Sequence, residues 1–86
     1  MSAELRNSIA EINPEALLCD GFDEAILGMA ERINLGPVVA YSEEKIIQIL
    51  MERDGMTDEE AYEFFHYNIK GAWVGDYTPI FITTEI

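Results

Sequence analysis

The chain has 86 residues and a formal net charge of −12, which arises from 17 acidic against 5 basic side chains. Hydrophobic residues make up 49% of it and charged residues 26%, a balance typical of a globular domain and not of a disordered segment. The negative charge repels phosphate, so it disfavours direct binding to nucleic acid and to anionic membrane surfaces. No apolar run approaches the roughly 20 residues of a membrane span, and the single cysteine, Cys19, fits a reducing compartment. We therefore expect one cytoplasmic domain over residues 1–86.

The N-terminal segment is predicted to form a short helix over residues 3–12. Ser2 is a suitable N-cap residue, and Pro14 ends the helix because a proline cannot continue it. Because terminal elements often fray, residues 1–13 are expected to form a frayed or appended helix. The apolar side chains that recur at helical spacing and should face the core are Leu5, Ile9 and Ile12.

The sequence of residues 23–33 is compatible with either a helix or a strand. Their alanine, leucine, methionine and glutamate residues favour a helix. Gly28 at the centre favours a strand, as does the β-rich run over residues 38–41 that follows a turn. A hairpin over about residues 25–41 would pair the two runs, and we favour this interpretation.

Two helices with clear end signals are predicted next, as a tight αα-hairpin over about residues 43–70. Ser42 can cap the first helix, and Gly55 suits the left-handed position at its end. Thr57 and Glu60 have the spacing of a capping box for the second helix, which should stop at Gly71. The apolar residues expected to face inward are Ile46, Ile47, Ile49, Leu50, Ala61, Phe64, Phe65 and Ile69.

The last element is predicted to be a strand over about residues 79–84, with its proline at the start, where a missing N–H does least harm. The fold class is therefore α+β: a small antiparallel sheet, made of the hairpin at about 25–41 and the C-terminal strand at about 79–84. The αα-hairpin at about 43–70 is expected to pack on one face of that sheet.

The residue types that carry chemistry do not form a catalytic pattern in this sequence. His66 has Glu63 on its own helix face, and an acid–base pair is an alternative to a surface histidine. Cys19 follows Leu17 and Leu18, which indicates a core thiol and not a nucleophile. The acids at residues 54–58 do not match a calcium loop. We expect a protein that is not an enzyme, with no catalytic residue, cofactor or dedicated metal site.

Three segments resemble those of a group of short uncharacterised proteins of bacteriophages and prophages. They are DGFDEAILG at residues 20–28, the run from Glu44 to Thr57 that includes ERDGMT, and GAWVG at residues 71–75 with TPIF at 78–81. The likeness spans about residues 17–82 and leaves the N-terminal segment outside. It implies a setting in the cytoplasm of an infected host cell, and it brings no assigned activity or site residue.

The acidic charge suggests a functional hypothesis, a non-enzymatic module that binds a host or viral protein with a basic surface. A rigid fold covered with carboxylates can occupy a groove meant for phosphates, as an inhibitor of the DNA-mimic or anti-CRISPR kind would. The alternatives are a homo-oligomeric structural or regulatory phage protein, such as a homodimer, a small metabolite-binding protein, and an acidic surface that only confers solubility. The candidate partner-binding residues are Glu43, Glu44, Glu52, Asp54, Asp58, Glu59, Glu60, Glu63, Trp73 and Tyr77.

Overall fold

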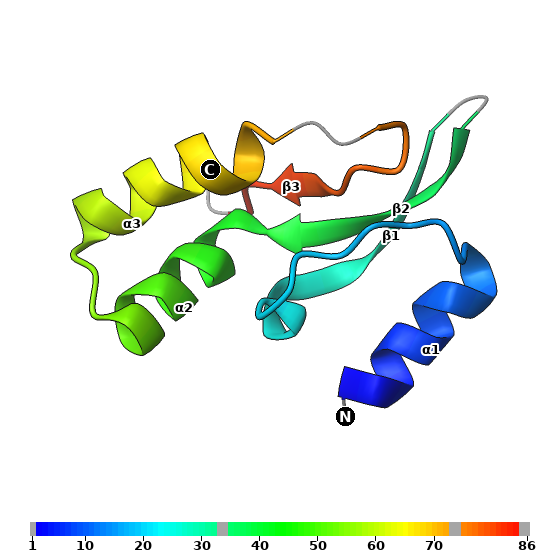
Figure 1. Ribbon diagram of the computed structural model, residues 1–86, viewed down its shortest axis with the longest axis horizontal. Helices are drawn as coiled ribbons and strands as arrows, with labels where there is room; N and C mark the ends of the chain where they lie inside the picture. Colours follow the sequence, from blue (N-terminus) through cyan, green and yellow to red (C-terminus); the bar gives the residue numbers. More distant parts are fainter. Residues whose placement is uncertain (1, 33–34, 73–74, 85–86) are drawn as a thin grey trace.

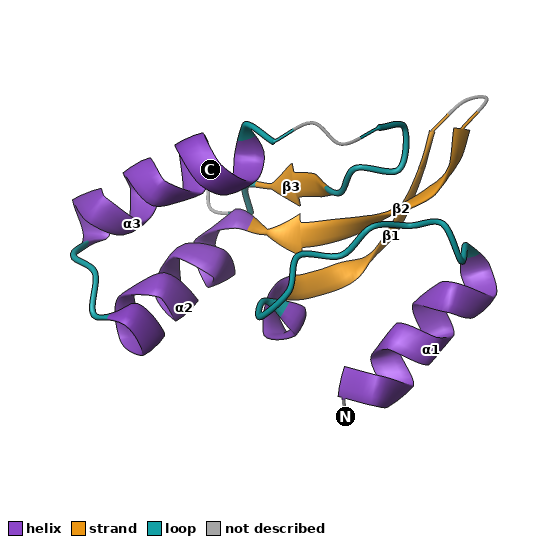
Figure 2. Ribbon diagram, viewed as in Figure 1, coloured by secondary structure: helices purple, strands orange, loops and turns teal. Residues whose placement is uncertain are grey.

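The computed structural model describes residues 2–32, 35–72 and 75–84 and confirms the α+β class (Figures 1 and 2). A 3-10 turn, η1, precedes the first strand, and a π-helical stretch, η2, continues the third helix. In chain order the elements are α1 (Ser2–Ile12), η1 (Asp23–Ala25), β1 (Ile26–Arg32), β2 (Leu35–Ser42), α2 (Glu43–Asp54), α3 (Asp58–Phe64), η2 (Phe65–Lys70) and β3 (Ile80–Ile82). Across these described ranges, no helix has both the length and the apolar character needed to cross a bilayer.

Residues 26–32 form a strand, which settles the choice between helix and strand in this segment. β1 pairs with β2 in antiparallel register, with Met29 opposite Val39. The register shifts between Ile26 and Gly28, where Gly28 has a φ of 154° that side-chain-bearing residues rarely adopt. Glycine at this position therefore permits a local irregularity in the strand, as in a β-bulge.

The predicted antiparallel pairing of the last strand is wrong, because β3 runs parallel to β2, with Ala40 opposite Ile80. Two antiparallel helices return the chain to the end of β2, so a strand that followed directly would run antiparallel to it. The chain first travels back along the sheet instead (Figure 1), and the ring of Tyr77 lies beside Gly36 near the start of β2. It then turns and enters β3 in the direction of β2. The sheet is therefore mixed, with the order β1-β2-β3.

The αα-hairpin is confirmed, together with the signals that predicted its ends. The hydroxyl of Ser42 accepts a hydrogen bond from the backbone N–H of Lys45, and Gly55 adopts the left-handed conformation with φ 68°. Thr57 and Glu60 form a reciprocal capping box at the start of α3. Each signal acts within five residues of the chain, which explains why the sequence predicted the hairpin closely.

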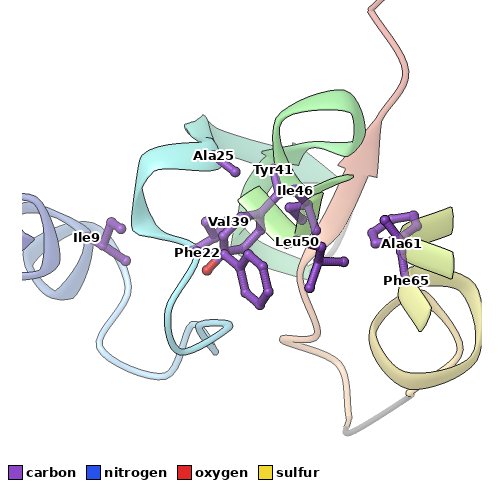
Figure 3. Packing of buried hydrophobic residues seen from close by; sticks show 9 residues of the cluster. All are labelled: Ile9, Phe22, Ala25, Val39, Tyr41, Ile46, Leu50, Ala61 and Phe65. Atoms are coloured by element: carbon purple, nitrogen blue, oxygen red, sulfur yellow. The ribbon is translucent and has the colours of Figure 1, made fainter. Parts of the chain in front are cut away.

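One hydrophobic core joins the sheet to the helices (Figure 3). Val39 and Tyr41 are alternate residues of β2, so both point to one face of the sheet. They share the core with side chains from α1, α2 and α3, which places the helices on that face, as expected. The buried members of the cluster are Ile9, Phe22, Ala25, Val39, Tyr41, Ile46, Leu50, Ala61 and Phe65.

Two side chains predicted to face the core are substantially exposed. Ile12, at the end of α1, is 55% exposed, whereas Ile9 of the same helix is buried in the core. Phe64 is 38% exposed, whereas its neighbour Phe65 is completely buried. Adjacent helix positions differ by about 100° in direction, so α3 can turn only one of the two phenylalanines fully inward.

Candidate functional site

Exposed carboxylates gather where α2 ends and α3 begins. Asp58 and Glu59 occupy the first turn of α3, Glu63 lies one turn further on, and Glu52 lies in the last turn of α2. The helix α3 itself contains no basic residue. We call this set, Glu52, Asp58, Glu59 and Glu63, the hairpin acidic surface; all four residues are exposed.

Asp54 and Glu60 lie at the same end of the hairpin, but both have local partners. Asp54 accepts hydrogen bonds from Arg53, at 3.2 Å. The carboxylate of Glu60 accepts a 2.9 Å hydrogen bond from the N–H of Thr57, which lowers the pKa of Glu60 below its ordinary value. Glu52 also accepts a 3.1 Å hydrogen bond from the side-chain amide of Gln48, at an exposed position. Asp54 and Glu60 therefore shape the hairpin, while Glu52, Asp58, Glu59 and Glu63 keep exposed carboxylates.

Glu43 and Glu44 are placed elsewhere, at the opposite end of α2. The carboxylate of Glu43 is 10% exposed and accepts a 2.7 Å hydrogen bond from the hydroxyl of Thr83. Glu44 accepts hydrogen bonds from the hydroxyl and the backbone N–H of Thr84. Both acids join the start of α2 to the chain that follows β3, so the structure does not bring them together with the hairpin acidic surface.

Of the two aromatic residues proposed for contact, Trp73 lies outside the described residues. Tyr77 is half-buried, and its backbone carbonyl accepts a 3.2 Å hydrogen bond from the N–H of Leu17. Tyr77 therefore holds the N-terminal segment against the sheet and lies apart from the acids of α3.

Two tyrosines that the sequence hypothesis did not select lie beside the acids. Tyr62, Glu63, His66 and Tyr67 line an open hollow of about 430 Å³ on α3 and η2, which we call the tyrosine hollow. Tyr67 is 82% exposed and Tyr62 is 51% exposed. Part of the signal for this surface was present in the sequence, because the inward position of Ala61 directs its neighbour Tyr62 outward.

A separate apolar groove of about 370 Å³ lies between the segment after α1, the third helix and β3. Its apolar lining includes Leu17, Leu18, Phe22, Phe64, Ile69 and Phe81, and the exposure of Phe64 noted above results from this opening. Arg53 lies at the groove with its guanidinium 4.8 Å from the centre of the Phe22 ring. That guanidinium also donates hydrogen bonds to the carbonyl of Gly21 and to the carboxylate of Asp54, so its positive charge is already paired with a negative one.

The two side chains weighed for catalysis, Cys19 and His66, are both partly buried. Cys19 lines the apolar groove, and burial raises the pKa of its thiol, which disfavours the nucleophilic thiolate. The Nε2 atom of His66 is buried 3.9 Å from Oε1 of Glu43 and has no hydrogen-bond partner among the residues that the structure describes. Because Glu43 is also bound by Thr83, this cluster joins α2, η2 and the chain after β3.

Comparison of the chain with known protein families, with curated proteins and with solved structures finds no match. In the part of the chain that the structure describes, no three acidic, histidine or cysteine side chains are placed to hold one metal ion. The hypotheses about function therefore rest on the surfaces described above.

Proposed function

We propose that this protein is an acidic protein-binding module that occupies a basic, nucleic-acid-binding groove of a partner protein. The hairpin acidic surface is the observation that carries the proposal. Its carboxylates are exposed on a helix pair with capped ends, and α3 contributes no basic side chain to neutralise them. A fixed array of negative charge on a folded surface can take the place of phosphates in such a groove.

The distribution of ion pairs supports this choice of surface. Arg6 pairs with Asp20 and Asp23 at the N-terminal end of the domain, and Arg53 pairs with Asp54. Within the described ranges, the acids of the hairpin acidic surface form no ion pair. Glu11 and Glu15 near α1 also form no ion pair in the described residues, so the hairpin acidic surface is distinguished by the clustering of its acids. This clustering is expected to give negative potential at the junction of α2 and α3, where it would attract a basic partner over several ångströms.

Affinity capture with the immobilised full chain, followed by mass spectrometry, tests this proposal. We expect nucleic-acid-binding proteins to be retained from host lysate at low salt, and to be released both by high salt and by added duplex DNA. Retention that is insensitive to salt and to DNA would contradict the proposal.

A pair of matched variants adds a control to the same experiment. Glu59→Gln with Glu63→Gln removes two charges from the hairpin acidic surface and should weaken capture strongly. Glu11→Gln with Glu15→Gln removes two exposed charges near α1 and should leave capture almost unchanged. An equal loss of capture in both double variants would indicate an effect of net charge alone and would contradict a specific role for the hairpin acidic surface.

The apolar groove favours a second candidate function, the binding of a small apolar metabolite. Its volume of about 370 Å³ and its lining of leucine and phenylalanine suit such a ligand. Thermal denaturation in the presence of a panel of small apolar compounds tests this function. A compound that binds should raise the midpoint temperature of unfolding of the wild type. It should not raise that of Phe64→Asp, because this variant places a carboxylate at the apolar groove.

A further inference from the structure

We infer that the tyrosine hollow binds an arginine side chain of the partner protein. This inference rests on the proposed function and names the group that the acidic module recognises. The tyrosine hollow lies on the same helix as Glu59 and includes Glu63, so a chain that docks on the hairpin acidic surface would reach it.

The lining of the tyrosine hollow is complementary to a guanidinium group. Tyr62 and Tyr67 contribute aromatic rings to the lining, and the face of such a ring attracts a cation through its negative potential. Glu63 supplies a carboxylate that, in the described part of the chain, takes part in no ion pair. A guanidinium is planar and weakly hydrated, so it can stack on a ring and bind a carboxylate at the same time, which an ammonium group does less well. The chemistry therefore favours arginine over lysine.

One of the two tyrosine rings, that of Tyr62, is held in place before a partner arrives. The ring of Tyr62 packs on His66 with ring centroids 4.3 Å apart, and His66 packs edge-on against the buried Phe65. A ring that is already fixed loses little conformational freedom on binding, so more of the contact energy contributes to affinity.

The backbone beneath the tyrosine hollow also departs from a regular helix. Residues 65–70 are π-helical, and the N–H of Gly71 donates to the carbonyl of His66 at 3.0 Å, five residues back. Such stretches are rare and occur frequently at functional sites. Tyr67 lies within this stretch and is the most exposed of the large hydrophobic side chains in the described residues.

Lys70 is the basic residue at the end of η2, and it is not part of the lining. Its charge opposes the approach of an arginine, so it provides a useful control. Lys70→Gln should leave binding unchanged or strengthen it, whereas loss of a tyrosine ring should weaken it.

Two labelled peptides test the inference with the full-length chain. One carries arginine alternating with serine, the other has lysine in place of each arginine, and binding is measured by fluorescence anisotropy at low ionic strength. We expect the wild type to bind the arginine peptide about three-fold more tightly. Tyr67→Ala should abolish this preference, while Tyr67→Phe, which keeps the ring, should retain it. Glu59→Gln should weaken the binding of both peptides to the same degree.

The outcomes distinguish this inference from the proposed function. Equal affinity of the wild type for both peptides would overturn the arginine site and would leave binding by the hairpin acidic surface in place. Binding of neither peptide would overturn both proposals. A preference for arginine that survives in Tyr67→Ala would place the selective contact elsewhere and would also overturn the assignment to the tyrosine hollow.

Discussion

The hydroxyl of Thr83 donates a 2.7 Å hydrogen bond to the carboxylate of Glu43, and this contact joins the chain after β3 to the first residue of α2. Glu43 is 8% exposed as a whole residue, so its charge needs a donor inside the fold. A residue expected to contact a partner is therefore part of the domain's own structure.

Removal of this donor should destabilise the protein. We expect Thr83→Val to lower the free energy of unfolding by about 1–3 kcal/mol, because the nearly buried carboxylate of Glu43 loses its hydrogen bond. Urea denaturation followed by circular dichroism measures the change. Thr84→Val is the control: its hydroxyl binds Glu44 at an exposed position, so a change within about 0.5 kcal/mol is expected. Equal losses in the two variants would contradict this role for Thr83.

The two adjacent phenylalanines should differ sharply in their contribution to stability. Phe65 is fully buried, and Phe65→Ala should cost about 3–5 kcal/mol through lost burial and the cavity that remains. Phe64→Ala should cost less than half as much, because that ring is 38% exposed at the apolar groove. Thermal and urea denaturation measure both values. If Phe65→Ala does not fold, Phe65→Leu allows the comparison, and a smaller loss for Phe65→Leu than for Phe64→Leu would show that the helix face is wrongly assigned.

The capping box predicts a pH dependence at the start of α3. Hydrogen bonds from Thr57 lower the pKa of Glu60, so the folded state prefers the ionised carboxylate. The stability that this preference supplies is present above the ordinary pKa of glutamate, about 4.3, and is lost as the pH falls through the lower folded value. Glu60→Gln keeps a side-chain acceptor for the box but cannot titrate.

Denaturation of the wild type and Glu60→Gln between pH 3 and pH 7 tests this assignment. The wild type should be the more stable protein at neutral pH, and its advantage should shrink as the solution becomes acidic. A difference in unfolding free energy that stays constant over this range would contradict the preference for an ionised Glu60.

Local signals explain why the helix hairpin could be predicted. Ser42, Gly55 and the pair Thr57 and Glu60 each specify a helix end through contacts within a few residues of the chain. Gly28 and the β-rich run over residues 38–41 favoured a strand within residues 23–33 without deciding it, and the structure places that strand at Ile26–Arg32. The turn expected before residue 38 was wrong for residues 35–37, because β2 already begins at Leu35. The outward position of Tyr62 also follows from helix spacing, although the sequence could not show that Tyr67 joins it in one hollow.

The roles of the individual acids depended on contacts across the fold. Glu43 and Glu59 belong to similar acidic pairs at the starts of their helices, yet Glu43 is buried against Thr83 and Glu59 is exposed. What separates them is the direction of β3, which brings Thr83 and Thr84 to the start of α2.

Composition and short-range pattern were thus sufficient for the net charge, the helix hairpin and the α+β class, because these depend on neighbours along the chain. The same patterns favoured the β-hairpin, and the structure decided it. The parallel pairing of β3 and the division of the acids between structural and exposed positions came only from the folded chain. Both depend on where residues 75–79 return the chain beside β2, and residues 40 positions apart then meet through contacts that no local pattern encodes.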